Sequence, residues 1–305
     1  MSRGDFINFD LLENNSDYND ISNPLIFKFK TNAKSFKINF TISNKVVGNY
    51  PHVGVSLREG LTIMYRKPGD KTWLYVDLVT QRFSPEIYMT HYIKEDIIYE
   101  VLIYGPILTK LSSLSVEIND EYLIENSPFD FNQKIIVAGG LNSFGIGCTS
   151  AGYMFSNILS RKLNADISHL TYNEVNYLDN IYEDIKNLDY KNPYDIGILE
   201  LDYIDQDDDN VERYLEDVVD ALSSKCKIVI GWFSIPIKEY KKNNIYQILK
   251  YNLDNKNLFI TNIDSIYGEL NDICTYSNRF INDSANVVIY ENLMKIIMEL
   301  TKWNI

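Results

Sequence analysis

The chain has 305 residues, of which 45% are hydrophobic and 23% are charged, and its formal net charge is −13. This length is enough for one large domain or for two ordinary ones with filled cores. The negative charge argues against nucleic acid as a partner, because nucleic-acid binders gain affinity through clustered Lys and Arg. No apolar run is long enough to cross a membrane, and the first ten residues have no apolar leader. We therefore expect a cytoplasmic protein.

Neither the cysteines nor the acidic residues have the spacing of a known metal site. Cys148, Cys226 and Cys274 are too few and too scattered for a disulfide framework or a structural zinc site. A run of acidic residues at 205–209 lacks the glycine and the distal glutamate of a calcium loop. We interpret it as solvated charge near the start of a helix. The sequence predicts no metal and no cofactor.

The first half of the chain shows the alternation of apolar and polar residues that is typical of strands with one buried face. The clearest case is Phe36, Ile38, Phe40 and Ile42, with polar residues between them. Further strands are predicted at residues 53–57, 61–65, 72–76, 98–103 and 114–118. Short runs separated by turn residues favour a jelly-roll-like antiparallel β-sandwich over residues 1–130.

The pattern changes after Pro128, where short, wholly apolar runs begin to alternate with helical segments. Predicted strands lie at 135–138, 165–167, 196–200, 227–230 and 258–261, and predicted helices lie at 176–188, 211–222 and 240–251, with a last helix near the C-terminus. Continuous apolar strands separated by helices indicate a buried parallel sheet. We predict a flavodoxin-like three-layer α/β/α domain over residues 131–305, with its site at the carboxyl ends of the strands.

A glycine-rich segment, Gly139-Gly-Leu-Asn-Ser-Phe-Gly145, lies where the first strand of the second half gives way to a helix. It is not a Walker loop, because no lysine follows the last glycine, and it lacks the glycine register of a dinucleotide loop. The segment instead resembles the nucleophile turn of the SGNH (GDSL) hydrolases, in which Gly-Asp-Ser is followed by Asn or Ile, Ser or Thr, any residue and Gly. The resemblance places Gly140 at the Asp and Leu141 at the nucleophilic serine.

The likeness continues on both sides of this turn. Residues 147–150, Gly-Cys-Thr-Ser, and residues 158–163 resemble segments of a two-domain SGNH subgroup that includes acyltransferases of polyketide tailoring. That subgroup begins with a β-sandwich, which ends in a phrase like the one at residues 103–118. The resemblance therefore covers most of the chain and implies an esterase or acyltransferase ancestry.

The catalytic groups that the resemblance implies are not intact. An SGNH enzyme carries a C-terminal Asp-x-x-His, in which the histidine is the base, and here that phrase is Asp283-Ser-Ala-Asn286. The only histidines are His52, His91 and His169. The family's oxyanion glycine falls near Thr171, and its asparagine after the third strand is not evident around Asp202. Loss of any member of such a triad costs orders of magnitude in rate.

Other groups could have rebuilt the site. Ser143 follows the lost nucleophile by two residues, and Cys148 and His169 lie near the same edge, so a cysteine–histidine pair is the sharpest rescue hypothesis. For Cys148 and for His169 we favour a role in packing. Trp73, on a predicted strand of the first half, is the aromatic residue to test for sugar stacking.

Two functions remain open. The first is a non-catalytic binding or scaffold protein, a pseudoenzyme that keeps the SGNH shape and binds a small molecule, a glycan or a protein with Gly140, Asn142, Thr171 and Asp202 lining its crevice. The second is an esterase, deacetylase or O-acyltransferase that acts on a sugar or a small natural product through Ser143 or Cys148 with His169. A structural role in a homo-oligomer is a third possibility.

Overall fold

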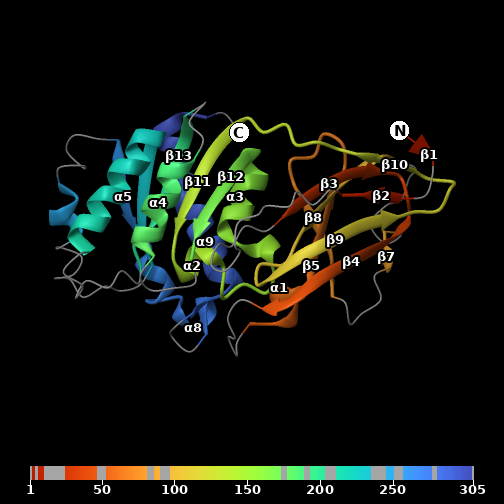
Figure 1. The fold of residues 1–305 in the computed structure, drawn as a ribbon, viewed down its shortest axis with the longest axis horizontal. Coiled ribbons are helices and arrows are strands. Elements are labelled where there is room, and N and C mark those ends of the chain that lie inside the picture. Colours follow the sequence, from red (N-terminus) through yellow and green to blue (C-terminus); the bar gives the residue numbers. More distant parts are fainter. Residues whose placement is uncertain are drawn as a thin grey trace. The chain divides into compact units, whose positions relative to one another are not determined.

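The computed structural model describes residues 2–3, 6–9, 25–46, 53–80, 86–89, 97–172, 177–188, 193–202, 211–234, 245–250, 257–276 and 280–303 (Figure 1). The chain forms two compact units. The first consists of Met1–Asn19, Pro24–Asp130 and Thr149–Gly152. The second consists of Asp20–Asn23, Phe131–Cys148 and Tyr153–Ile305. The predicted acidic run at 205–209 lies outside the described residues, as do His52 and His91.

The first unit contains two antiparallel sheets. The six-stranded sheet has the order β1-β10-β3-β8-β5-β6, and the four-stranded sheet has the order β2-β9-β4-β7. The strands are β1 Ser2–Arg3, β2 Phe6–Asn8, β3 Ile26–Thr31, β4 Ser35–Val46, β5 Leu61–Arg66, β6 Leu74–Val79, β7 Glu86–Tyr88, β8 Tyr99–Tyr104, β9 Thr109–Glu117 and β10 Leu123–Asn126.

Alternate residues of these strands enter one shared apolar core. Phe27 and Phe29 of β3 are buried in the same cluster as Phe36 and Ile38 of β4, although β3 and β4 belong to different sheets. The period of two along each strand places one side chain in two on this side. The alternation in the sequence therefore predicts which residues of β3 and β4 are buried.

One predicted strand is wrong. Residues 53–57 were expected to be extended, but the chain forms helix α1, Val55–Glu59. The Arg58 backbone N–H donates to the Gly54 carbonyl at 3.2 Å, and Gly60 ends the turn. A Cβ on Gly60 would lie 2.5 Å from the Ser56 carbonyl oxygen, so this stop requires glycine. A five-residue run fits one turn of helix as well as a strand. Only Leu57 of α1 is fully buried, so the burial pattern shows neither a helical period nor a strand period.

The second unit is built on a five-stranded parallel sheet with the order β12-β11-β13-β14-β15. Numbered from its own first strand, this is the flavodoxin-like order 2-1-3-4-5. The strands are β11 Gln133–Gly139, β12 Ala165–Thr171, β13 Tyr194–Glu200, β14 Cys226–Phe233 and β15 Leu258–Asn262. A small antiparallel pair, β16 Thr275–Tyr276 and β17 Phe280–Ile281, lies outside this sheet.

Helices cover both faces of the parallel sheet (Figure 1). Ile135 and Val137 of β11 pack in a core with α3 and α9, whereas Ile136 and Ala138 pack in a core with α4 and α5. The helices are α2 Leu141–Phe144, α3 Phe155–Leu163, α4 Leu178–Asn187, α5 Val211–Lys225, α8 Asn271–Cys274 and α9 Asp283–Thr301, with 3-10 turns at Ala151–Tyr153 and Asp264–Ile266. The predicted helix at 240–251 lies only partly within the described residues. The predicted three-layer α/β/α architecture is confirmed.

Candidate functional site

The turn after β11 lies at the carboxyl edge of the parallel sheet. The strand ends at Gly139, and α2 begins at Leu141 and ends at Gly145, which has a φ of 87° in the left-handed region that favours glycine. Leu141 is partly exposed, whereas Asn142 and Ser143 are buried. Of these three side chains, only the one at the family's nucleophile position reaches solvent, and it is aliphatic.

Beneath this turn lies a buried carboxylate from the neighbouring strand. Glu200, the last residue of β13, accepts hydrogen bonds from the Ser143 N–H at 2.7 Å and from the Asn142 N–H at 3.3 Å. Gly139 makes room for it, because a Cβ at residue 139 would lie 2.5 Å from the Glu200 Cβ. The backbone donors of residues 142 and 143 are therefore directed at a carboxylate of the protein itself.

A second carboxylate extends this cluster. Asp202 accepts a hydrogen bond from the Asn142 Nδ2 at 3.0 Å and another from the Ser234 N–H at 2.9 Å, and the Ser234 hydroxyl also donates to it. The Tyr177 hydroxyl contacts the carbonyl oxygens of Glu200 and Asp202, at 3.0 and 2.7 Å. Asp202 and Asn142 were expected to bind a ligand, and both are almost completely buried in protein contacts.

The two carboxylates affect each other. Burial, and then the charge of Asp202, raise the pKa of Glu200 to about 8, although the hydrogen bonds from Ser143 and Asn142 oppose this shift. Two adjacent buried carboxylates disfavour double ionisation, so the charge of Asp202 favours the protonated form of Glu200.

The start of α9 is the place of the family's Asp and His. The Asn282 side chain caps this helix by accepting the N–H groups of Ser284 and Ala285. Asn286 is fully buried, its Oδ1 accepts the Phe155 N–H at 2.9 Å, and its Nδ2 donates to the Asn282 carbonyl at 2.9 Å. Asn286 therefore joins the first residue of α3 to the first turn of α9.

The loop after α2 packs against the strand that precedes α9. A Cβ on Gly147 would lie 1.3 Å from the Ile281 carbonyl oxygen, so only glycine permits this approach. Burial, and then the charge of Asp283, raise the pKa of the Cys148 thiol. Cys148 therefore lies near Asp283. The turn that carries Leu141 and the start of α9 meet at the same edge of the parallel sheet.

The remaining predicted residues are buried in the structure. The His169 Nε2 lies 2.9 Å from the Ser156 Oγ, between β12 and α3, and burial lowers the pKa of this imidazole to about 4. Thr171 ends β12 beside Gly139 and is fully buried. Gly140 lies against the Tyr177 ring, 2.6 Å from where its Cβ would be.

Sequence reasoning missed three residues of this cluster, namely Glu200, Tyr177 and Ser234. The available signal was the single carboxylate that ends the apolar run 196–200, because an acid in a buried parallel strand needs a partner. Tyr177 and Ser234 carry no comparable signal, since their roles depend on contacts made only in the folded chain.

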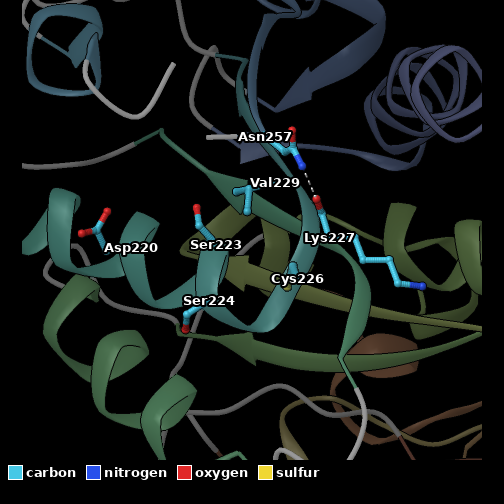
Figure 2. A pocket seen from close by; sticks show the side chains of 7 residues that line it. All are labelled: Asp220, Ser223, Ser224, Cys226, Lys227, Val229 and Asn257. Carbon is cyan, nitrogen blue, oxygen red and sulfur yellow. Dashed lines mark hydrogen bonds between the residues drawn. The ribbon is translucent and has the colours of Figure 1, made fainter. Parts of the chain in front are cut away.

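A pocket of about 550 Å³ lies at the opposite, amino edge of the sheet. Figure 2 shows its lining, from the end of α5 (Asp220, Ser223, Ser224), the start of β14 (Cys226, Lys227, Val229) and Asn257 before β15. The Lys227 ammonium pairs with Asp195 at 2.7 Å, and the Asn257 amide donates to the Lys227 carbonyl. This pocket shares no residue with the Glu200 cluster.

The described residues contain no group of three or more His, Cys, Asp or Glu side chains that could hold a metal ion. Among the helices described, none has the length and apolar character needed to span a membrane.

No family model and no curated protein matches the sequence. Solved structures do match. A GDSL-like lipase from Bacteroides ovatus superimposes with a TM-score of 0.72 at 17% identity, covering 91% of this chain and 84% of that one. Salicylyl-acyltransferase SsfX3 from a tetracycline biosynthetic pathway gives 0.62 at 12% identity, covering 90% and 82%. An active-site mutant of a family two carbohydrate esterase from Clostridium thermocellum gives 0.61 at 8% identity, covering 99% and 100%.

The strand order and the helices on both faces define a three-layer α/β protein, a class in which sites lie at the carboxyl edge of the sheet. The matches identify the particular version of this architecture, and the chain has the SGNH/GDSL hydrolase fold. The resemblance predicted from residues 139–163 is confirmed at the level of fold.

Proposed function

We propose that this chain is a non-catalytic protein that keeps the SGNH fold and uses its crevice for binding or scaffolding. The observation that carries the proposal is the role of Asn286, at the position where the resemblance places the catalytic histidine. Both ends of its amide make hydrogen bonds: the Oδ1 accepts the Phe155 N–H of α3, and the Nδ2 donates to the Asn282 carbonyl at the start of α9. A base must be free to accept a proton from a nucleophile, and this side chain cannot accept one and is already engaged.

The turn at the nucleophile position supports the same proposal. Leu141 has no hydroxyl, and the N–H groups of the next two residues donate to Glu200. A backbone donor stabilises a developing oxyanion only if it points at the reacting oxygen. These two donors are directed at a fixed carboxylate, so this part of the turn is closed to a substrate anion.

The residues that could have rebuilt the chemistry are unfavourably placed. Ser143 is 1% exposed. The pKa of the Cys148 thiol is raised by burial and by Asp283, which is opposite to the shift that activates a nucleophilic cysteine. The His169 imidazole contacts the Ser156 hydroxyl, and a backbone hydrogen bond with Ile167 also acts on it. A hydrolase that works through these groups is therefore the less favoured alternative.

An activity assay tests the proposal. Purified protein is incubated with p-nitrophenyl acetate and, separately, with a fluorophosphonate probe, beside Leu141→Ala, Ser143→Ala and His169→Ala variants. We expect no labelling and no turnover that depends on any of these three residues. Turnover by the wild type that disappears in Ser143→Ala or His169→Ala would contradict the proposal and establish the alternative.

We also keep the cytoplasmic location and the absence of a nucleic-acid partner as proposals, supported by the net charge of −13 and the scattered cysteines. The crevice ligand would be a small molecule, a glycan or a protein. In this proposal residues 131–305 carry the crevice and residues 1–130 are the accessory part.

A further inference from the structure

The outer face of the six-stranded sheet carries a group of charged side chains from three adjacent strands. Lys28 and Lys30 lie on β3, Glu100 lies on β8 and Arg66 lies on β5. Glu100 is paired with Lys30 on one side and with Arg66 on the other. Their neighbours along each strand, such as Phe29, are buried in the core of this unit. The four charged side chains therefore project from the opposite face of the sheet.

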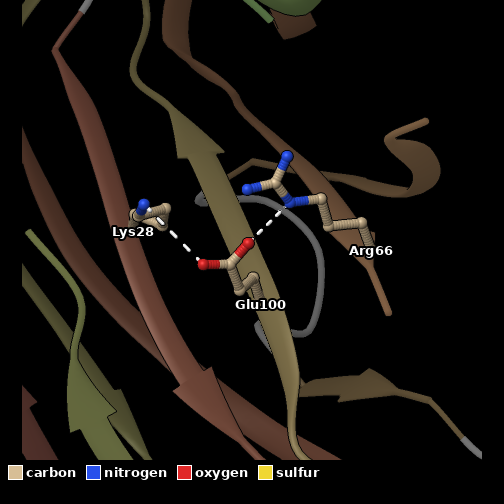
Figure 3. A network of polar contacts seen from close by, with 3 residues as sticks. All are labelled: Lys28, Arg66 and Glu100. Atoms are coloured by element: carbon tan, nitrogen blue, oxygen red, sulfur yellow. Dashed lines mark hydrogen bonds and ion pairs between the residues drawn. The ribbon is translucent and has the colours of Figure 1, made fainter. Parts of the chain in front are cut away.

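Contacts hold this group in place (Figure 3). The Arg66 Nε donates to one Glu100 oxygen at 2.5 Å, and the Lys28 ammonium lies 3.8 Å from the other oxygen. An aromatic ring packs against each of these two cations. The Lys28 ammonium lies 5.1 Å from the centre of the Phe129 ring, and the Arg66 guanidinium lies 4.5 Å from the centre of the Trp73 ring. Groups that are already ordered lose less freedom when a ligand binds.

The same charges are partly withdrawn from solvent. The side chains of Lys28, Glu100 and Arg66 are 10%, 14% and 27% exposed, and Lys30 is also partly buried. Burial lowers the pKa of the Lys28 ammonium. The Glu100 carboxylate opposes this shift, whereas the charges of Arg66 and Lys30 lower the pKa further. Water therefore screens the repulsion among the three cations less than it would on an open surface.

Cations outnumber carboxylates in this group. Arg66 and Lys28 share the Glu100 carboxylate, and Lys30 has no ion pair in the part of the chain that the structure describes. Glu125 lies opposite Lys30 on β10, but Glu125 is exposed, so water screens its charge. Two positive charges are therefore in excess in a partly buried group, although the chain as a whole carries −13. Uncompensated buried charge costs stability, so a purely structural group would be expected to be closer to neutral.

We propose that Lys28, Lys30 and Arg66 form a binding site for a phosphate group, either inorganic phosphate or a phosphate monoester. Such a group carries close to two negative charges, which matches the excess of two positive charges. Its oxygens accept hydrogen bonds from the two ammonium groups and from the Nη groups of Arg66, whose Nε donates to Glu100. A ligand with a single carboxylate would neutralise only half of the excess. The site is independent of the crevice, because its residues belong to the first unit.

Isothermal titration calorimetry tests the proposal, with inorganic phosphate, methyl phosphate and acetate as titrants at about pH 8, where phosphate monoesters are doubly charged. The variants are Lys30→Gln and Arg66→Gln. Lys37→Gln is the matched control, because Lys37 is an exposed lysine on β4 of the other sheet and its replacement changes the net charge equally. We expect a phosphate compound to bind the wild type and Lys37→Gln with the same Kd, of about 1 mM or lower. Binding to Lys30→Gln and Arg66→Gln should be weaker by about tenfold or more.

The two phosphate compounds distinguish the sources of the ligand. Tighter binding of methyl phosphate would assign the site to an esterified phosphate, and tighter binding of inorganic phosphate would assign it to the free ion. Either result supports the proposal.

Three results would overturn it. The first is that neither phosphate compound binds the wild type. The second is that Lys30→Gln binds phosphate as tightly as Lys37→Gln does. The third is that acetate binds the wild type as tightly as the phosphate compounds do. If Arg66→Gln does not fold, Lys30→Gln decides, because its replacement breaks no described ion pair and should leave thermal unfolding without phosphate unchanged.

Discussion

Glu200 occupies the space that a side chain at Gly139 would need, with 2.5 Å between the Glu200 Cβ and a Cβ built on residue 139. The two residues end adjacent parallel strands, β13 and β11. The absence of a side chain at 139 lets the carboxylate reach the N–H groups of residues 142 and 143. A glycine in this strand thus fixes the turn that carries Leu141.

Gly139→Ala is expected to destabilise the second unit by about 1–3 kcal/mol, the usual cost of overpacking a filled site. The clash is with the Glu200 Cβ, which cannot move without moving the backbone. Urea unfolding followed by tryptophan fluorescence measures the effect, since Trp232 is buried in this unit. In Gly54→Ala, the control, the new Cβ would meet only the Ser56 Oγ at 3.5 Å. Equal stability of the two variants would contradict the packing described here.

Asn286→Ala should cost about 1–3 kcal/mol of stability, because it leaves the Phe155 N–H without its acceptor in a buried place. Asn292→Ala is the control, since Asn292 lies on the same helix, is partly exposed and makes one described hydrogen bond, to the Val288 carbonyl. We expect a loss below about 1 kcal/mol for that variant. If both variants melt alike, Asn286 does not join the two helices as proposed.

The sequence predicted the layers of the second unit because each strand is a short apolar run between helical segments. It also placed the turn at residues 139–145 at the carboxyl edge, since every parallel strand followed by a helix ends there. It could not predict that Glu200 lies under this turn, because that contact joins residues 57 and 58 positions apart and depends on two strands lying side by side. The helix at Val55–Glu59 was missed for a different reason, namely that five residues carry too little periodicity.

The thiol of Cys148 is expected to be unreactive in the native protein. All three cysteines are free and buried, and burial raises the pKa of each. Because the thiolate is the reactive form, Ellman's reagent at neutral pH should modify essentially none of them in buffer and all of them in urea. Rapid alkylation of Cys148 by iodoacetamide without denaturant would instead revive the cysteine–histidine hypothesis.

His169 should make the second unit less stable in acid. Its folded-state pKa of about 4 lies below the ordinary histidine pKa of 6.5, so the unfolded chain binds the proton more readily. The stability that the neutral His169 contributes to the folded state is fully present above pH 6.5 and is lost as the pH falls from 6.5 towards 4. Replacement by glutamine in a His169→Gln variant should reduce this loss, which thermal unfolding in buffers of different pH would reveal. If His169→Gln loses as much thermal stability at low pH as the wild type, groups other than His169 cause that loss.

Glu200 should have the opposite effect at higher pH. Its folded-state pKa of about 8 lies above the ordinary glutamate pKa of 4.5, so the folded state holds a proton that the unfolded chain releases. Its contribution is therefore fully present below pH 4.5 and declines as the pH rises from 4.5 to 8. In a Glu200→Gln variant, the slope of unfolding free energy against pH in this window should be shallower by up to about 1.4 kcal/mol per pH unit. An Asp202→Asn variant is expected to move the decline to lower pH, since it removes the charge that helps to raise the pKa of Glu200. Identical slopes in the wild type and in Glu200→Gln would mean that Glu200 is ionised throughout, and that the cluster beneath Leu141 holds no proton.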